Sequence, residues 1–203
     1  MSTLAGDQPQ VHFQNHILVG LGGTGGSTLR EFRKELFQRH RNKLPAGLRL
    51  EYIYLDSSDH DLNESESWRV LGSSVQLPND SRIHISVPNL RRMVDNAPQF
   101  PAISQWLGDV SVWRTYLDNQ QGLRAAGGQR RRMGRVLCAA NIGAFTRQIA
   151  GHYNTVTTGG QAGASGNEGV TFHILCGLAG GTGSGFRGRR GDSDRKIHQG
   201  TKR

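Results

Sequence analysis

The stretch GLAGGTGSG at residues 177–185 holds five glycines, a threonine and a serine in nine positions, directly after the apolar run VTFHILC at residues 170–176. An apolar run of this length that is bounded by glycine is typical of a strand. A chain without Cβ atoms adopts positive φ angles and approaches a ligand closely, so consecutive N–H groups can turn toward one anion. The stretch therefore predicts a phosphate-binding loop at the end of a strand.

A second glycine segment, GLGGTGG at residues 20–26, follows another apolar run, HILVG at residues 16–20. If such a segment begins a helix, the unpaired amides of the first turn and the helix dipole add to the attraction for an anion. We therefore expect both segments to bind the phosphates of one nucleotide. The predicted contacts are Gly22, Gly23, Thr24 and Gly25 in the first segment and Gly180, Gly181, Thr182, Gly183 and Ser184 in the second.

Strand patterns and helix patterns alternate along the chain. Strands are predicted at residues 16–20, 48–56 and 170–176, with a short one at 82–87, and helices from about residue 26 to 44, at 103–117 and at 133–153. This alternation predicts an α/β fold with a Rossmann-like, mostly parallel sheet and helices on both faces. In such sheets the ligand binds beyond the carboxyl ends of the strands, where both glycine segments would lie.

The chain has 203 residues and a formal net charge of +9, much of which lies at its end. Residues 186–203 hold seven basic and two acidic residues, and we expect them to form a solvated, disordered tail. No aromatic residue follows Phe186 among these arginines, so nucleic acid is not favoured as a partner. No apolar stretch is long enough for a membrane span and no signal-peptide core begins the chain, which predicts a cytoplasmic protein without a membrane partner.

Two other classes of function are compatible with parts of the sequence. The first glycine segment also matches the pattern G-x-G-x-x-G, which indicates an NAD-binding oxidoreductase domain. An acid normally follows that pattern about 20 residues on and binds a ribose hydroxyl. Here Asp56 lies 31 residues after Gly25. The arginine-rich segments indicate, as a third alternative, a basic interaction module that binds acidic partners. A Walker-type loop is excluded, because neither glycine segment ends in Gly-Lys-Ser/Thr.

The segment AGGTGSG at residues 179–185 matches in full the signature that tubulins share with the bacterial division protein FtsZ. The chain therefore resembles the tubulin/FtsZ superfamily, over residues 15–185. GLGGTGGSTL (20–29), YLDSSD (54–59) and AAGGQRRRMGR (125–135) are similar in order and spacing to the family's first three nucleotide loops. The amino-acid sequences of these segments look more like those of divergent bacterial tubulin-like proteins than like those of eukaryotic tubulin.

This resemblance implies part of a filament-type GTPase that binds GTP or GDP together with Mg²⁺. The first and fourth loops would hold the diphosphate. The third loop, with Gly127, Gly128 and Arg130, would sense the γ-phosphate. The second loop contains Asp56 and Ser57, and its aspartate would lie near the magnesium ion or its water shell.

Some of the residues that the resemblance assigns also have a plainer interpretation. Ser27 would lie near the base and the phosphates by its position in the first loop. Asp56 has the alternative of closing a turn or capping a helix. Arg130, Arg131 and Arg132 have the alternative of a solvated helix start, and we expect this of at least one of them.

The resemblance stops after Gly185. The family continues with a helix, further strands, a helix that contacts the base and an acidic loop, whereas residues 186–203 contain almost no apolar side chain to bury. Permitted codons for residues 186 onward, when they are read one base later, give an apolar-patterned helix. We therefore expect a truncated or frameshifted version of a longer protein, and the coding DNA tests this hypothesis.

Catalysis in this superfamily requires two subunits stacked head to tail, because the second subunit supplies the acidic loop. That loop is missing from the sequence, so no catalytic residue and no metal ligand is assigned, and we expect weak nucleotide binding and negligible hydrolysis by the isolated chain. Head-to-tail self-association is implied for the full-length relative. The predicted organisation is a flexible N-terminus at 1–14, an incomplete tubulin-like nucleotide-binding domain at 15–185 and the basic tail at 186–203.

Overall fold

The computed structural model describes residues 14–41, 43–118, 131–158 and 169–186. The predictions made for the N-terminus before residue 14, for Gly127, Gly128 and Arg130 in the third loop, and for the tail after Phe186 lie outside the described residues.

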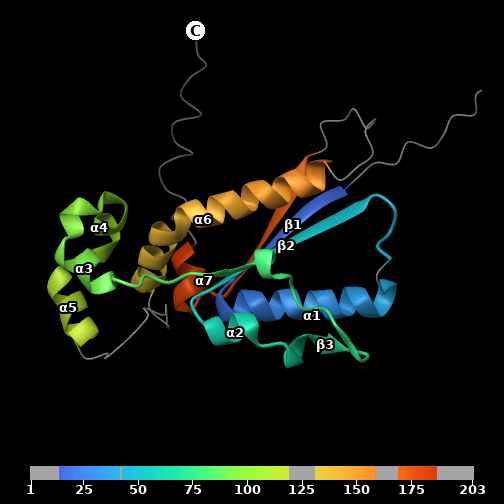
Figure 1. Ribbon diagram of the computed structural model, residues 1–203, viewed down its shortest axis with the longest axis horizontal. Coiled ribbons are helices and arrows are strands. Elements are labelled where there is room, and N and C mark those ends of the chain that lie inside the picture. Colours follow the sequence, from blue (N-terminus) through green and yellow to red (C-terminus); the bar gives the residue numbers. More distant parts are fainter. Residues whose placement is uncertain (1–13, 42, 119–130, 159–168, 187–203) are drawn as a thin grey trace, which may run out of the picture.

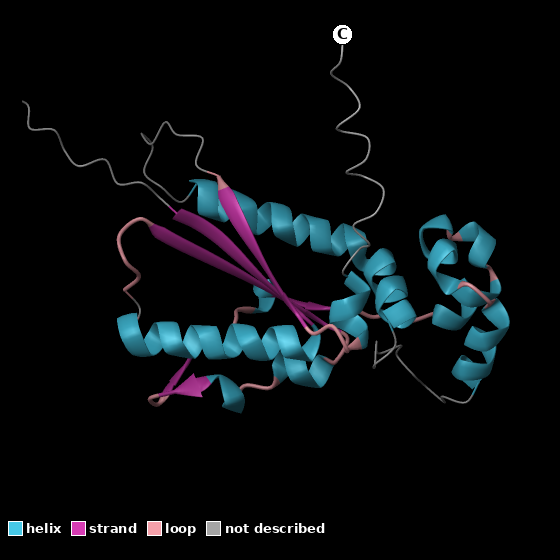
Figure 2. Cartoon of the chain, turned by 180° about the vertical axis from the view of Figure 1, so that it is seen from behind, coloured by secondary structure: helices cyan, strands magenta, loops and turns pink. Residues whose placement is uncertain are grey.

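The core of the fold is a parallel sheet with the strand order β5-β2-β1-β6. Its strands are β1 (Gln14–Leu21), β2 (Leu48–Asp56), β5 (Arg82–His84) and β6 (Val170–Cys176), and every pairing among them is parallel. A separate antiparallel pair, β3 (Arg69–Val70) and β4 (Ser73–Ser74), lies beside α1 on the side away from the sheet (Figures 1 and 2). The predicted strands at 48–56 and 170–176 are confirmed in their bounds.

Helices cover both faces of the sheet, with α1 along one face and α6 along the other (Figure 1), and Figure 2 shows the same layers from behind. The chain is therefore an α/β protein of the predicted class. None of the helices in the described ranges combines the length and the hydrophobicity that a bilayer crossing requires. The helices are α1 (Gly22–His40), α2 (Asp59–Asn63), α3 (Leu90–Asp95), α4 (Pro101–Leu107), α5 (Val110–Asp118), α6 (Arg131–Thr158) and α7 (Gly181–Phe186), with single 3₁₀ turns at 66–68, 79–81 and 97–99.

Successive side chains of β1 point to opposite faces of the sheet and divide the core in two. Ile17, Val19 and Leu21 belong to the cluster on the α6 face, which also contains residues of α3, α4 and α5. Leu18 belongs to the cluster on the α1 face, together with Leu29 of α1. Because both faces of β1 are buried, its sequence is a continuous apolar run instead of an alternating one.

Gly20 and Leu21 of the first glycine segment end β1 and residues 22–26 begin α1, so the prediction of a separate loop followed by a helix from about residue 26 was wrong. Leu21 ends β1 with an extended backbone, and Gly22 turns the chain into the helix with a φ of +70°. Glycine adopts this angle without steric cost, which permits a strand to pass into a helix with no connecting residues. The amides of the segment are therefore those of a helix terminus.

Three other predicted elements differ from the structure. The helix predicted at 103–117 is two helices, α4 and α5, because the chain turns at Gly108 with a φ of +65°. The strand predicted at 82–87 ends at His84. The helix predicted at 133–153 is longer in the structure and extends over the whole of α6, in which Ala140 is exposed and His152 is buried.

The N-terminal part of α6 packs directly on α7 at Gly134. A Cβ atom at this position would collide with the carbonyl oxygen of Gly181 and would lie 3.3 Å from Cα of Gly185. Gly134 is buried, so no rearrangement toward solvent relieves this contact. The absence of a side chain thus allows the two helices to approach each other at backbone distance.

Gly134→Ala is expected to destabilise the fold by about 1–3 kcal/mol, because the added methyl group has no space between α6 and α7. The matched control is Gly151→Ala in the same helix, where no atom lies within 4 Å of the added methyl group. This control is expected to stabilise the fold by about 0.5–1 kcal/mol, since alanine is the better helix former. Urea denaturation measures both free energies of unfolding, and equal effects at the two positions would contradict the packing described here.

The C-terminal half of α6 is held to β2 by polar contacts. The buried His152 places its Nδ1 2.7 Å from Oε2 of Glu51. This hydrogen bond raises the pKa of His152 above its ordinary value, against the opposing effect of burial. Arg49 of the same strand donates from Nη1 to the carbonyl oxygen of Val156 at 3.0 Å. These contacts lie at the amino end of the strands, opposite the glycine segments.

The stabilising effect of the His152–Glu51 pair is expected to depend on pH. Because folding raises the pKa of His152, the contribution is fully present below the ordinary value of 6.5 and is lost as the pH rises through the folded-state pKa. Between about pH 6 and about pH 9, the melting temperature of the wild-type chain should therefore fall more steeply than that of Glu51→Gln. Thermal unfolding followed by circular dichroism measures both profiles, and parallel profiles would refute the pairing.

Candidate functional site

The carboxyl ends of β1, β2 and β6 meet at one edge of the sheet, beside the N-terminal ends of α1 and α7 (Figure 1). A pocket of about 260 Å³ lies at this edge. Its walls come from the end of β1 and the first turn of α1, from the turn after β2, and from the segment that joins β6 to α7. The lining residues are Leu21, Gly22, Gly23, Thr24, Asp56, Ser57, Ser58, Asp61, Gly177, Gly180, Gly181, Thr182 and Gly183.

The first turn of α1 presents uncapped backbone amides to the pocket. The N-cap residue is Leu21, and no side chain accepts a hydrogen bond from this turn as a cap. The first amides of a helix have no partner within the helix, and they lie at the positive end of the helix dipole. The hydroxyl-bearing Thr24 adds a further donor at the same wall. An anion in the pocket would meet donors that the protein itself leaves free.

The second glycine segment lies against the first. A Cβ atom on Gly22 would be 3.2 Å from the amide nitrogen of Gly183 and from Cβ of Thr182, so the two backbones are in contact. Thr182 is buried, and its Oγ1 lies 3.1 Å from Oγ of Ser57. The fold therefore brings three segments that are far apart in the sequence to one pocket.

Asp56 has the geometry of a turn-closing residue. Its side chain is 4% exposed, and it accepts hydrogen bonds from the Tyr54 hydroxyl at 2.8 Å and from the Ser58 amide at 3.1 Å. Burial raises the pKa of Asp56 above its ordinary value, although the hydrogen bond from Tyr54 acts in the opposite direction. These contacts agree with the interpretation that Asp56 closes a turn. The residue also lines the pocket.

Most of the predicted site residues line the pocket. Those that line it are Gly22, Gly23, Thr24, Asp56, Ser57, Gly180, Gly181, Thr182 and Gly183. Three others do not. Gly25 is buried against the carbonyl oxygen of Leu175, Ser27 is exposed on α1, and Ser184 donates to the carbonyl oxygen of Gly180.

Four lining residues were not predicted: Leu21, Ser58, Asp61 and Gly177. Leu21 is the last residue of β1 and Gly177 directly follows β6, so the rule that ligands bind beyond strand ends was sufficient to find them. Asp61 lies beyond the segment YLDSSD, and no motif in the sequence marked it as a site residue. It reaches the pocket because Ser58 caps α2 by accepting from the Asp61 amide at 3.2 Å.

The ionisable side chains that line the pocket, within the described part of the chain, are Asp56 and Asp61. Arginine and lysine are absent from that lining. Among the described residues, the donors that an anion in the pocket would meet are amide and hydroxyl groups, and the two carboxylates would repel it.

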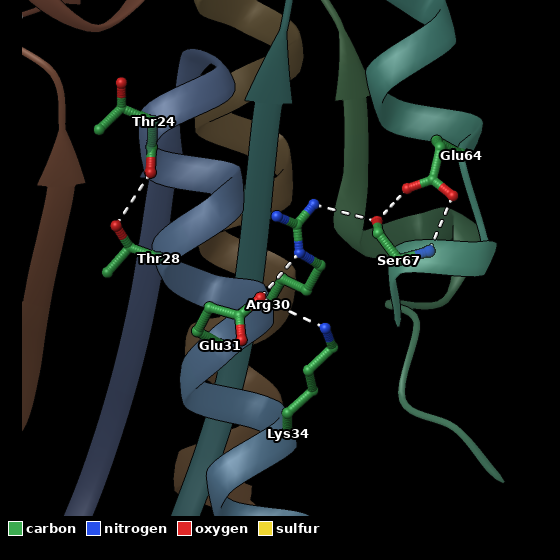
Figure 3. A network of polar contacts seen from close by, with 7 residues as sticks. All are labelled: Thr24, Thr28, Arg30, Glu31, Lys34, Glu64 and Ser67. Atoms are coloured by element: carbon green, nitrogen blue, oxygen red, sulfur yellow. Dashed lines mark hydrogen bonds and ion pairs between the residues drawn. The ribbon is translucent and has the colours of Figure 1, made fainter. Parts of the chain in front are cut away.

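A polar network joins α1 to the segment after α2 (Figure 3). Arg30 donates from Nη1 to Oγ of Ser67 at 3.0 Å, and Ser67 donates from its amide to Glu64 at 2.8 Å. Within α1, Glu31 accepts from Arg30 at 3.1 Å and from Lys34 at 3.3 Å. The network thus joins the middle of α1 to residues 64–67, which directly follow α2.

The parallel sheet and the paired glycine segments agree with the resemblance to tubulin-like proteins that the sequence indicates. The chain belongs to the family described as "Tubulin like", whose sequence model matches residues 17–188.

Among solved structures, the chain is similar to the GDP-bound monomer of CetZ1 from Haloferax volcanii, with 16% identity and a TM-score of 0.44. The similarity covers 85% of this chain and 34% of that one, so the chain spans about a third of the length of this relative. None of the curated proteins matches the chain significantly.

Tyr54→Phe is expected to destabilise the fold by about 1–3 kcal/mol at neutral pH, because the buried Asp56 carboxylate loses a hydrogen bond. The same substitution is expected to raise the pKa of Asp56 further, since the Tyr54 hydroxyl lowers it. Tyr153→Phe, at a position on α6 that is 44% exposed, is the matched control and should change the free energy by less than about 0.5 kcal/mol. Urea denaturation measures both, and an unchanged value for Tyr54→Phe would show that this bond does not form in solution.

Proposed function

We propose that the pocket binds the phosphates of GTP or GDP and that the chain is the nucleotide-binding part of a tubulin-like, filament-type GTPase. One observation carries the proposal. The glycine segments at 20–26 and 177–185, which are far apart in the sequence, lie in contact at the carboxyl edge of the parallel sheet. Membership of the tubulin-like family supports a guanine nucleotide as the ligand.

The chemistry of the walls supports phosphate as the group that is bound. The uncapped first turn of α1 directs N–H groups and the positive end of a dipole toward the pocket. The hydroxyls of Thr24 and Thr182 line the same space and supply donors for further phosphate oxygens. Glycine at the contacts keeps the walls free of side chains that would hold an anion away from the amides.

The acidic lining supports Mg²⁺ as the accompanying cation. Mg²⁺ is usually bound by one or two carboxylates together with phosphate oxygens and water. Asp61 is exposed and lines the pocket, whereas the oxygens of Asp56 already accept from Tyr54 and Ser58. We therefore place Asp61 nearest to the ion, with Asp56 as the residue that shapes the turn. Bound Mg²⁺ would neutralise charge that the phosphates and carboxylates bring together.

The alternative of an NAD-dependent oxidoreductase has less support. A dinucleotide fingerprint would use Gly20, Gly22 and Gly25 and gives no role to the second glycine segment. It also needs a free acid for a ribose hydroxyl, and Asp56 is buried with its oxygens engaged. The alternative of a basic interaction module rests in part on the tail at 186–203, nearly all of which lies outside the described residues.

For the full-length relative we propose the GTPase activity that is general in the superfamily. Hydrolysis in the superfamily would require a second subunit that supplies an acidic loop, so we propose head-to-tail assembly for the full-length relative and a cytoplasmic location. For this chain in isolation we propose nucleotide binding with negligible hydrolysis. A robust rate of GTP turnover by the purified chain would refute that proposal.

Mg²⁺ is expected to strengthen the binding of GDP to the purified chain, and the effect of Asp61→Asn on that binding is expected to depend on the metal. In Mg²⁺ the variant should bind GDP roughly three- to ten-fold more weakly, because a ligand of the ion is lost, while in EDTA it should bind as tightly or more tightly, because a repelling charge is lost. Fluorescence anisotropy of a labelled GDP measures both conditions.

Asp109→Asn is the matched control, because Asp109 lies at the start of α5, away from the pocket lining, and accepts from Ser111. It should leave GDP binding unchanged in both conditions. NAD should fail to displace the labelled GDP. Displacement by NAD at concentrations similar to those of GDP would favour the oxidoreductase alternative.

A further inference from the structure

Arg131, the first residue of α6, contacts the segment that joins β6 to α7. Its Nη2 donates to the carbonyl oxygen of Leu178 at 3.0 Å. Leu178 lies between Gly177 and Gly180, both of which line the pocket. An arginine of the segment that resembles the third loop is thus bonded to the backbone of the fourth.

The middle of this segment lacks the burial that normally fixes a loop. Leu178 is 55% exposed and Ala179 is exposed as well, so no packed side chain restrains them. Restricting such a backbone costs conformational entropy, which a polar contact has to offset. Ser184 holds the carbonyl oxygen of Gly180 from within α7. Arg131 supplies the corresponding contact at Leu178 from another helix.

The bond to Leu178 also fixes the direction of the next amide. The peptide bonds are trans, and in a trans peptide the C=O and N–H groups point in opposite directions. A carbonyl that points to Arg131 therefore turns the N–H of Ala179 away from α6. One turn further along α6, Gly134 contacts Gly181 at backbone distance. The beginning of α6 thus sets both the orientation and the position of the second glycine segment.

The neighbouring arginine of α6 has a different contact. The guanidinium of Arg132 lies at the turn between α4 and α5, 3.0 Å from the place that a Cβ atom on Gly108 would take. Of Arg131 and Arg132, then, Arg131 is the one whose bond to the glycine segment fixes the pocket wall.

We propose that Arg131 is a positioning residue of the pocket, which acts by holding the Leu178 carbonyl and not by contacting a phosphate. The expected effect of Arg131 on nucleotide affinity rests on the proposed function. Its effect on the order of the second glycine segment does not require a nucleotide. The second glycine segment is then ordered before the ligand arrives, and the ligand does not have to offset the cost of ordering it.

The test compares the full chain with Arg131→Ala, Arg131→Lys and Arg147→Ala. Arg147 is the matched control, since it is an exposed arginine of the same helix that lies away from the pocket lining. Hydrogen exchange measured by mass spectrometry without nucleotide reports the order of the peptide covering residues 177–186. Anisotropy of labelled GDP in Mg²⁺ reports affinity in the same four proteins.

In Arg131→Ala the peptide at 177–186 should exchange faster than in the wild type, while peptides of β1 and β2 stay unchanged. Its affinity for GDP should fall roughly three- to ten-fold, as expected for the loss of one hydrogen bond. Arg131→Lys, which keeps a donor and the charge, should lie between Arg131→Ala and the wild type, and Arg147→Ala should match the wild type. Unchanged exchange at 177–186 in Arg131→Ala would overturn the proposal.

The two arms of the test separate this inference from the proposed function. If the wild-type chain binds no GDP, the proposed function fails, and the exchange comparison alone then supports or overturns the role of Arg131. If GDP binds and Arg131→Ala weakens it without any change in exchange, Arg131 acts on the phosphate directly and the positioning role is wrong.

Discussion

The structure around the pocket depends on backbone segments that approach each other more closely than side chains permit. α1 contacts the end of β6 where Gly25 faces the carbonyl oxygen of Leu175, and α7 contacts α6 at Gly134. These contacts bring two helix N-termini to the same edge of the sheet. Any other residue in place of Gly25 or Gly134 would cause a steric clash, because even a single methyl group exceeds the available space. Glycine at these positions therefore permits the close approach on which the pocket depends.

A pocket built from backbone in this way has a particular electrostatic character. Its donors are amides and hydroxyls, and its ionisable groups, among the described residues, are the carboxylates of Asp56 and Asp61. The two acids have different surroundings. Asp56 is buried and bonded to Tyr54, whereas Asp61 is exposed at the start of the short α2. The two carboxylates therefore differ in their freedom to interact with a ligand, because the oxygens of Asp56 are already engaged within the protein.

The long helix α6 connects distant parts of the fold. At its beginning it contacts the second glycine segment through Arg131 and Gly134, and toward its end His152 bonds to Glu51 of β2. The two ends thus rest on opposite edges of the same sheet.

The sequence by itself determined the class of the fold, the bounds of β2 and β6 and the two glycine segments, because strand patterns and runs without side chains are local properties. It did not determine that VTFHILC would be an edge strand, with Phe172 42% and Ile174 55% exposed, since an apolar run looks the same with or without a neighbouring strand. Only the tertiary structure decided that Asp56 closes a turn, that Asp61 reaches the pocket and that Arg131 bonds to Leu178. Those roles depend on which distant groups lie within hydrogen-bonding distance, and chain folding alone sets these distances.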